Sequence, residues 1–381
     1  MTRPLAGCRV LDLGIITAGA ATSALLADLG ADVIKLESPT YRDPFRVWLS
    51  PQPDDDPNAP PPFFRFTNRG KRGVSLDLKH AEGRAAFLRL VQGSDIVVEN
   101  FRRGVLEKLQ IDYPALRAVN PNIILASISS QGDTGPDAKY VSFGSTLEAV
   151  GGLASLSGYA GGPPVVSGRE VNLPDQVVAI FAAGMVLTAW LHRRNGGGGA
   201  HLDLSQRELT SFLVGEAFIG DTPGRHGNAE PSFAIQDCLR TGDGNFIALS
   251  VTQQQLMALD ALTGAGPKPE TRTAALQGWC AERAASDCVD ALAAAGIAAA
   301  LVLNGEGILQ LRDCLWSHAL SHSAQHGLLK GFPFQCEQSP LHTQGDAPAV
   351  GAHTAEILRE LGGYTPDEIG ALVRTGAAEV P

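Results

Sequence analysis

The chain has 381 residues, of which 44% are hydrophobic and 18% charged, and its formal net charge is −10 at pH 7. This composition is typical of an ordinary soluble globular protein, and the length favours two or three domains. The negative charge argues against a nucleic-acid backbone as the main partner, because proteins that bind one usually present clustered positive charge.

The cellular compartment is predicted from three sequence features that are absent. We expect no apolar run to span a bilayer, and residues 1–7 lead straight into a strand-like segment, unlike a signal peptide. The cysteines form no Cys-x-x-Cys pair, so we expect buried thiols rather than a zinc site or a disulfide framework. We therefore predict a cytoplasmic protein that contacts no membrane. The six cysteines are Cys8, Cys238, Cys280, Cys288, Cys314 and Cys336.

The first third of the chain alternates short apolar runs with amphipathic ones. This alternation is typical of a parallel sheet covered by helices on both faces. The proline-rich segment 39–62 interrupts it, and we expect a surface loop near a site there. The expected strands are 9–13, 32–37, 73–78, 95–99 and 123–128, and the expected helices are 20–29, 82–92 and 113–119.

One basic region departs from the negative net charge. From Arg65 to Lys108 there are ten Lys and Arg residues against five Asp and Glu residues. A positive patch there would suit an anionic, phosphate-bearing small molecule. Solvated helix faces would give the same count.

The middle of the chain places one carboxylate at the start of a long apolar helix. A small-residue helix is expected at 146–158, and the apolar run 176–191, expected to be buried, follows Asp175. Unsatisfied first-turn amides and the helix dipole predict that Asp175 stays ionised and points outward, which suits a nucleophile. The alternative is a helix cap, which these residues alone favour. The glycines 196–199 lack a following Lys-Ser or Lys-Thr, so we expect a flexible turn rather than a phosphate loop.

The second half of the chain has a different order of expected helices and strands. After a linker-like segment at 220–231, we expect a hairpin, two helices and a strand, which together indicate a small inserted α/β domain. The last helix begins with a capping box from Thr365 to Glu368. Three histidines, His318, His322 and His326, recur at helical spacing, and we expect a partly exposed helix stripe rather than a metal site. The expected elements are strands at 238–240, 246–251 and 298–303, and helices at 253–262 and 271–295.

Familiar catalytic motifs are missing from the sequence. The opening strand, helix and strand end on Glu37, like half of a dinucleotide-binding fold, but Gly14 and Gly19 are spaced too widely for G-x-G-x-x-G. A dehydrogenase is therefore disfavoured. The sequence has no G-x-S-x-G, His-Glu-x-x-His or Walker motif.

Several blocks, taken in order, resemble the class III CoA-transferase family, which includes formyl-CoA transferase, carnitine CoA-transferases and α-methylacyl-CoA racemase. The resemblance covers nearly the whole chain, and the joint order of the blocks is more specific than any one of them. They are residues 5–13, 26–37, 68–72 with 76–79, Val98-Glu99-Asn100-Phe101-Arg102 and Asn120-Pro121.

The resemblance implies a reaction and its site. It implies that Asp175 is the nucleophile, which attacks the thioester of an acyl-CoA and passes through an aspartyl anhydride and an aspartyl-CoA thioester. CoA then moves between two carboxylic acids without ATP, metal or a prosthetic group, and coenzyme A or acyl-CoA is a substrate. The residues that the resemblance places against CoA are Thr17, Ala18, Leu76, Asp77, Leu78, Lys79, Asn100, Phe101, Arg102 and Lys108.

Where the sequence departs from the family pattern, some reactions and substrates of the family become disfavoured. Ser142-Phe143-Gly144 replaces the segment that carries the histidine base of the racemases, so racemisation is disfavoured. The Tyr-Glu pair of formyl- and oxalate-type transferases is also missing at Phe143-Gly144, and Ser38 replaces a CoA-contacting arginine. We expect neither formate nor oxalate as substrate. An acyl-CoA racemase or isomerase on the same fold and a non-catalytic CoA-binding homologue remain as alternatives.

The resemblance also implies the architecture. We expect a large Rossmann-like domain formed by residues 1–220 and completed by residues 328–381. Residues 221–327 form a smaller inserted α/β domain. Two protomers are expected to form a homodimer interlocked like two rings.

Overall fold

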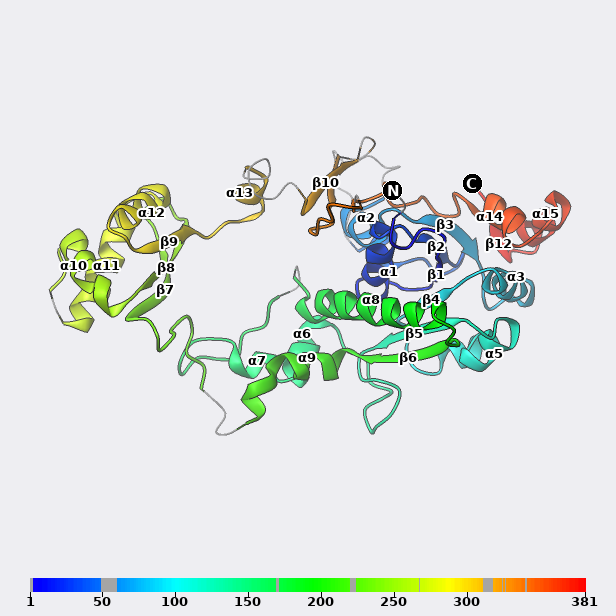
Figure 1. Cartoon of the computed structure of the whole chain (residues 1–381), viewed down its shortest axis with the longest axis horizontal. Helices are drawn as coiled ribbons and strands as arrows, with labels where there is room; N and C mark the ends of the chain where they lie inside the picture. Colours follow the sequence, from blue (N-terminus) through cyan, green and yellow to red (C-terminus); the bar gives the residue numbers. More distant parts are fainter. Residues whose placement is uncertain are drawn as a thin grey trace. The chain divides into compact units, whose positions relative to one another are not determined.

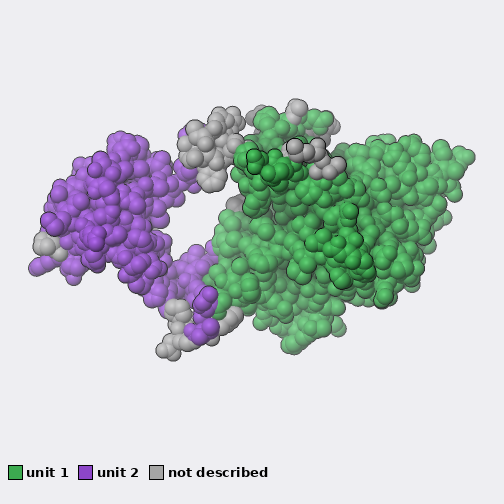
Figure 2. All heavy atoms as spheres, in the orientation of Figure 1, with its two compact units in different colours: residues 1–153, 167–215, 316–381 green, residues 154–166, 216–315 purple. Residues whose placement is uncertain are grey.

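The computed structural model describes residues 3–48, 60–168, 171–219, 224–266, 268–310, 318–323, 325, 327–339 and 341–381. The chain divides into two compact units (Figure 2). Unit 1 comprises residues 1–153, 167–215 and 316–381, and unit 2 comprises residues 154–166 and 216–315. The sequence-based boundaries at 220/221 and 327/328 assign segment 154–166 to the large domain, whereas it clusters with unit 2.

Unit 1 is built on a seven-stranded sheet in the order β12-β3-β2-β1-β4-β5-β6. Strands β1 to β6 are parallel, and β12 pairs antiparallel with β3. The order 3-2-1-4-5-6 is that of a Rossmann sheet, so the prediction of an α/β fold with a large parallel sheet is confirmed. The strands are β1 (Arg9–Asp12), β2 (Asp32–Glu37), β3 (Arg72–Leu76), β4 (Ile96–Glu99), β5 (Ile124–Ser129), β6 (Ala200–Ser205) and β12 (Ala378–Glu379).

Helices cover both faces of this sheet because its buried strands present apolar side chains on both sides (Figure 1). Leu11 of β1 belongs to a core that includes Phe87 of α3 (Ala81–Gln92) and Ile357 of α14 (Thr354–Glu360). Val10, its neighbour, faces the opposite core with α1 (Ala18–Asp28) and α8 (Leu173–Arg194). The other unit 1 elements are η1 (Pro44–Arg46), α2 (Pro62–Asn68), α4 (Val105–Leu109), α5 (Tyr113–Val119), α6 (Gly144–Val150), α9 (Gln206–Val214), β10 (Leu320–Ser323), β11 (Gly327–Lys330) and α15 (Pro366–Arg374).

Unit 2 has its own apolar core under a three-stranded antiparallel sheet in the order β7-β8-β9. The expected hairpin is present, and β7 pairs antiparallel with β8. The elements are β7 (Ile235–Arg240), β8 (Phe246–Val251), η3 (Gln253–Gln255), α10 (Leu256–Thr263), α11 (Pro269–Ala281), α12 (Ala285–Ala294), β9 (Ala298–Leu301) and α13 (Gly305–Gln310). Helix α7 (Leu153–Leu156) begins at the last residue of the first unit 1 segment, and η2 (Gly215–Phe218) begins at Gly215.

Two expected helices are each broken in two. The helix expected at 146–158 ends at Val150, because Gly152 has φ +93° and a Cβ on Gly151 would lie 2.6 Å from the Thr210 side chain. The helix expected at 271–295 is divided into α11 and α12. Sequence periodicity does not reveal such breaks, because both halves keep a helical pattern.

Two expectations about side chains are wrong. His322 lies on β10 of an antiparallel hairpin, not on a helix stripe, and His326 lies outside the described residues. Cys8, Cys280 and Cys288 are buried as expected, but two thiols are exposed because they lie on surface segments. These are Cys238 and Cys336, and Cys314 lies outside the described residues.

Helix α8 is less buried than expected. One side packs into the core, but Ile180, Phe181 and Met185 are exposed on the other side. Among the described residues α8 is the one helix long and apolar enough, by length and composition alone, to cross a membrane, a test that a core helix also passes. The expectation that no apolar run reaches that length is therefore wrong.

Candidate active site

Asp175 lies in the first turn of α8, directly after Pro174. Its carboxylate faces the start of α6. A Cβ placed on Gly144 would lie only 3.0 Å from Asp175 Oδ2 and 3.0 Å from Asn172 Oδ1. A side chain at position 144 would therefore crowd the carboxylate, and glycine lets the two helix ends approach.

The charge state of Asp175 differs from the prediction. Burial raises the pKa of Asp175 to about 7. Loss of hydration opposes the ionised form, in the direction opposite to the expected effect of the helix N-terminus. The cap alternative also fails, because Asn172 occupies the N-cap position without a side-chain cap, and within the described ranges no residue hydrogen-bonds the Asp175 side chain. A carboxylate of raised basicity is a stronger nucleophile once it is ionised.

The raised pKa of Asp175 makes stability depend on pH. The unfolded carboxyl, with a pKa of 3.8, loses its proton before the folded one, whose pKa is about 7. Between these values the folded state binds more protons, so the free energy of unfolding falls as pH rises. In urea denaturation, we expect Asp175→Asn to gain on the order of 2 kcal/mol relative to wild type between about pH 4 and pH 8, discounted for partial exposure.

Asp367→Asn is the matched control for this measurement. Asp367 also follows a proline in the first turn of a helix, α15, but it is exposed. As a surface substitution, it is expected to change the free energy of unfolding by less than about 0.5 kcal/mol. A constant difference for Asp175→Asn over the same pH range would contradict the raised pKa.

The carboxyl ends of β1 and β4 bring one group of the predicted CoA residues together. These strands are neighbours, and Asn100, which follows β4, reaches the turn that leads to α1. Asn100 Oδ1 accepts a hydrogen bond from Ile15 N at 2.7 Å. Thr17 and Ala18 begin α1 beside this contact, but both are buried, with 2% and 1% exposure.

The predicted block from Leu76 to Lys79 begins at the last residue of β3 on the same edge of the sheet, where β2 separates it from β1. Leu76 is buried in the core and Leu78 packs against it. Asp77 N donates to Ala377 O, and Asp77 Oδ1 accepts from Lys79 N at 3.0 Å. Two of the four side chains thus belong to the core, and Lys79 is exposed.

The remaining predicted residues surround the end of β4. Phe101 packs against the core and donates its backbone N–H to Glu99 Oε2 at 2.7 Å. Arg102 and Lys108 are exposed. Within the described residues, no hydrogen bond or ion pair joins Asp175 to any of the ten predicted CoA residues.

The basic region is only partly a surface feature. Half of its ten cations form ion pairs: Arg65 with Asp346, Arg69 with Asp28, Lys71 with Asp12, Arg72 with Asp32 and Glu356, and Arg103 with Asp203. The sequence count suggested a positive patch or solvated helix faces, and these five cations instead join elements of the fold. Lys79, Arg102 and Lys108, all predicted CoA residues, remain as exposed cations.

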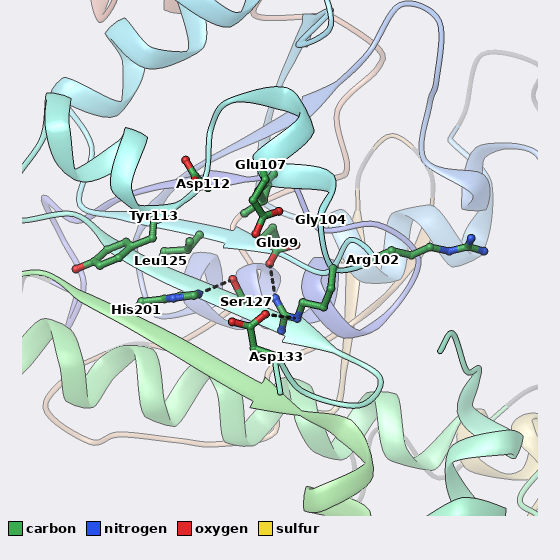
Figure 3. Close-up of a pocket in the computed structure, with 12 residues that line it drawn as sticks. Glu99, Arg102, Gly104, Glu107, Asp112, Tyr113, Leu125, Ser127, Asp133 and His201 are labelled. Carbon is green, nitrogen blue, oxygen red and sulfur yellow. Dashed lines mark hydrogen bonds and ion pairs between the residues drawn. The ribbon is translucent and has the colours of Figure 1, made fainter. Parts of the chain in front are cut away.

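A polar cavity of about 40 Å³ adjoins this edge and was missed by the sequence analysis (Figure 3). Its lining residues come from β4, β5 and β6, from α4 and α5 and from the loops beside them, and His201 Nε2 lies 3.1 Å from Ser127 Oγ. Burial raises the pKa of Glu99 to about 7 despite hydrogen bonds from Ser127 and the Phe101 amide. The strand order and the packing of α4 and α5 bring these residues together, so no sequence motif could reveal the cavity.

The site contains no metal cluster in the described part of the chain: no group of three or more His, Cys, Asp or Glu residues could hold an ion. Two stacked rings line the cavity, those of Tyr113 and His201, and their centroids are 5.3 Å apart. Arg103, which also lines the cavity, pairs with Asp203 at 2.8 Å and with Asp133 at 3.4 Å. These contacts join the ends of β4 and β6 to the loop after β5.

Comparison with known proteins supports the resemblance. Residues 5–354 match CoA-transferase family III. Succinate–glutarate CoA-transferase of Agrobacterium fabrum is 34% identical over 69% of this chain and 67% of its own length. Succinyl-CoA:mesaconate CoA-transferase of Haloarcula hispanica is 31% identical over 93% of this chain and 95% of its own. The crystal structure of a CaiB/BaiF family protein from Brucella suis has a TM-score of 0.87 and 28% identity over 95% of this chain and 100% of its own. The chain therefore belongs to CoA-transferase family III and is a CoA-transferase.

Proposed function

We propose that this enzyme moves CoA between two carboxylic acids through covalent intermediates on Asp175. The observation that supports this most is the position of Asp175: a partly buried carboxylate of raised basicity at a helix start, facing Gly144 and free of hydrogen bonds within the described ranges. A carboxylate tied up as a cap or in an ion pair would be a weaker nucleophile.

The reaction balances without water or ATP. An Asp175 oxygen attacks the carbonyl carbon of the donor acyl-CoA, and the C–S bond breaks to give a mixed anhydride and CoA thiolate. The thiolate then attacks the aspartyl carbonyl and releases the donor acid, which leaves an aspartyl-CoA thioester. The acceptor carboxylate repeats the two steps in reverse order, and Asp175 is regenerated.

For the substrates, we propose short dicarboxylic acids and their CoA esters. The support comes from relatives, whose names include succinate, glutarate and mesaconate. Lys79, Arg102 and Lys108 are exposed cations at the carboxyl edge that suit the phosphates of CoA. The Phe143-Gly144 pair leaves a small residue where a bulkier one would press on the nucleophile.

The proposed assembly is a homodimer in the cytoplasm. The exposed apolar side chains of α8 and α9, which include Phe181 and Phe212 with ring centroids 6.3 Å apart, support association with a second protomer. Sedimentation of the purified protein tests this, and a monomer at micromolar concentration would contradict it.

Trapping of the covalent intermediate tests the mechanism. The protein is incubated with succinyl-CoA and hydroxylamine, digested and analysed by mass spectrometry. We expect a hydroxamate on Asp175, because hydroxylamine attacks an activated aspartyl carbonyl. The Asp367 peptide, which carries the same Pro-Asp pair at a helix start, is the internal control and should remain unmodified. Transfer activity without an adduct on Asp175 would contradict the proposal, and isotope exchange at the α-carbon without transfer would favour a racemase.

A further inference from the structure

The turn between β1 and α1, residues 14–17, is held by the side chain of Asn100, the residue after the neighbouring strand β4. Asn100 Oδ1 accepts from Ile15 N at 2.7 Å, and Asn100 Nδ2 donates to Ile15 O at 3.0 Å. Both polar atoms of the Asn100 amide therefore bond the backbone of Ile15, one on each of the two peptide groups that flank its Cα. The preceding Gly14 N donates to Asp12 Oδ1 at 2.8 Å.

A buried ion pair holds the same turn from the other side. Lys35 is completely buried, pairs with Asp43 at 3.1 Å and donates to Gly14 O. The Asp43 carboxylate also accepts from Ile16 N at 3.2 and 3.3 Å. Four side chains, Asp12, Lys35, Asp43 and Asn100, thus fix consecutive backbone groups of the turn.

These contacts hold Ile16 in an unusual conformation. Ile16 has φ +59°, in the left-handed region that a β-branched residue rarely adopts. Such a conformation persists only where surrounding contacts determine it, and outliers of this kind concentrate at ligand sites. The opposite side of the turn is also tightly packed, since a Cβ on Gly19 would lie 2.8 Å from Asn100 Oδ1.

The turn lies where ligands bind in this type of sheet. Strand order reverses between β1 and β4, and ligands of open α/β sheets occupy the crevice at that point, outside the carboxyl ends of the strands. Thr17 and Ala18 are buried, whereas Ile15 and Ile16 are partly exposed. The turn therefore presents Ile15 and Ile16 rather than the two residues that follow them.

We propose that Asn100 and the Lys35–Asp43 pair are positioning residues, which preform the 14–17 turn and its strained Ile16 to receive acyl-CoA. This inference rests on the proposed function, and it changes the predicted role of Asn100. The side chain acts on CoA binding through the backbone of Ile15. If only a fraction of the molecules had the turn correctly formed, the apparent affinity for CoA would be reduced to that fraction of its intrinsic value.

The test compares Asn100 with Asn120, since each hydrogen-bonds a backbone turn, one at the carboxyl end and the other at the amino end of the parallel strands. Asn120 Nδ2 donates to Val91 O at 3.0 Å and Ser94 O at 2.8 Å, before β4 begins. Calorimetry with CoA should give a dissociation constant at least about tenfold higher for Asn100→Ala, but within about twofold of wild type for Asn120→Ala. In steady-state assays Asn100→Ala should raise KM more than it lowers kcat, and both variants should lower Tm.

Hydrogen exchange gives an independent readout on wild type. The Ile15 and Ile16 amides should be protected without CoA, and exchange at the unprotected rate would overturn the proposal. If Asn100→Ala does not fold, Asn100→Ser, which is neutral and too short to bridge both Ile15 atoms, provides the binding comparison. Equal affinity for wild type and the Asn100 variant would overturn the positioning role but leave the proposed function intact. Failure of wild type to bind CoA would overturn the proposed function itself.

Discussion

Asp175→Ala lowers the rate of CoA transfer by at least about a thousandfold, because loss of a covalent nucleophile removes the reaction path rather than one interaction along it. CoA binding should be largely retained, since no hydrogen bond or ion pair links Asp175 to the predicted CoA residues in the described parts of the chain. The measurement is transfer between succinyl-CoA and an acceptor acid, followed by chromatography of the CoA esters, with calorimetry for CoA binding.

Asp367→Ala separates the chemistry from the removal of an aspartate at a helix start. Both residues follow a proline in a first helical turn, but Asp367 is exposed and faces no glycine like Gly144. We expect Asp367→Ala to keep transfer within about twofold of wild type. Transfer by Asp175→Ala at close to the wild-type rate would refute the assignment of the nucleophile.

Lys35→Met lowers the free energy of unfolding by about 3–5 kcal/mol, because it leaves the buried Asp43 carboxylate and Gly14 O without their cation. Burial opposes the charge of Lys35, but Asp43, Asp12 and Glu37 outweigh it and raise its pKa. The charged form is thus favoured in the folded protein. Urea denaturation near neutral pH measures the loss.

Lys71→Met is the informative comparison, because Lys71 is also buried and paired, with Asp12 at 2.7 Å. Burial lowers the pKa of Lys71 to about 8, and nearby Lys35 adds to the effect. Its charge is disfavoured by folding, so we expect a smaller loss than for Lys35→Met. An equal or larger loss for Lys71→Met would contradict these pKa directions. The exposed Lys108→Met should change stability by less than about 0.5 kcal/mol.

Much of the fold was predictable, because the spacing of apolar residues along the chain indicates which side of each helix or strand is buried. The strand at Asp32–Glu37 and the helix at Tyr113–Val119 have the expected bounds, and Thr365 and Glu368 form the expected capping box. Helix breaks and the exposed side of α8 were not predictable. They depend on neighbours that are distant in sequence, such as Thr210 against Gly151.

The sequence indicated which residues belong to the site, but not how buried or how charged they are. Resemblance selected Asp175, but its pKa depends on how deeply packing against other elements removes it from water, which sequence does not state. Lys35 reads as an ordinary charge within an apolar strand, yet it is fully buried. The left-handed Ile16 has no sequence signal at all, because glycine or asparagine would be the expected residue there.

The pairing of β12 with β3 also constrains how the protein is made. Ala378 lies opposite Leu76, and the last helices supply part of the core beneath the sheet. In chain order, β12 therefore joins the sheet of unit 1 only after residues 216–315, which have a core of their own, have been synthesised. Unit 1 thus depends on two segments on either side of unit 2 for its sheet and its core, whereas unit 2 can form its core from one nearly continuous segment.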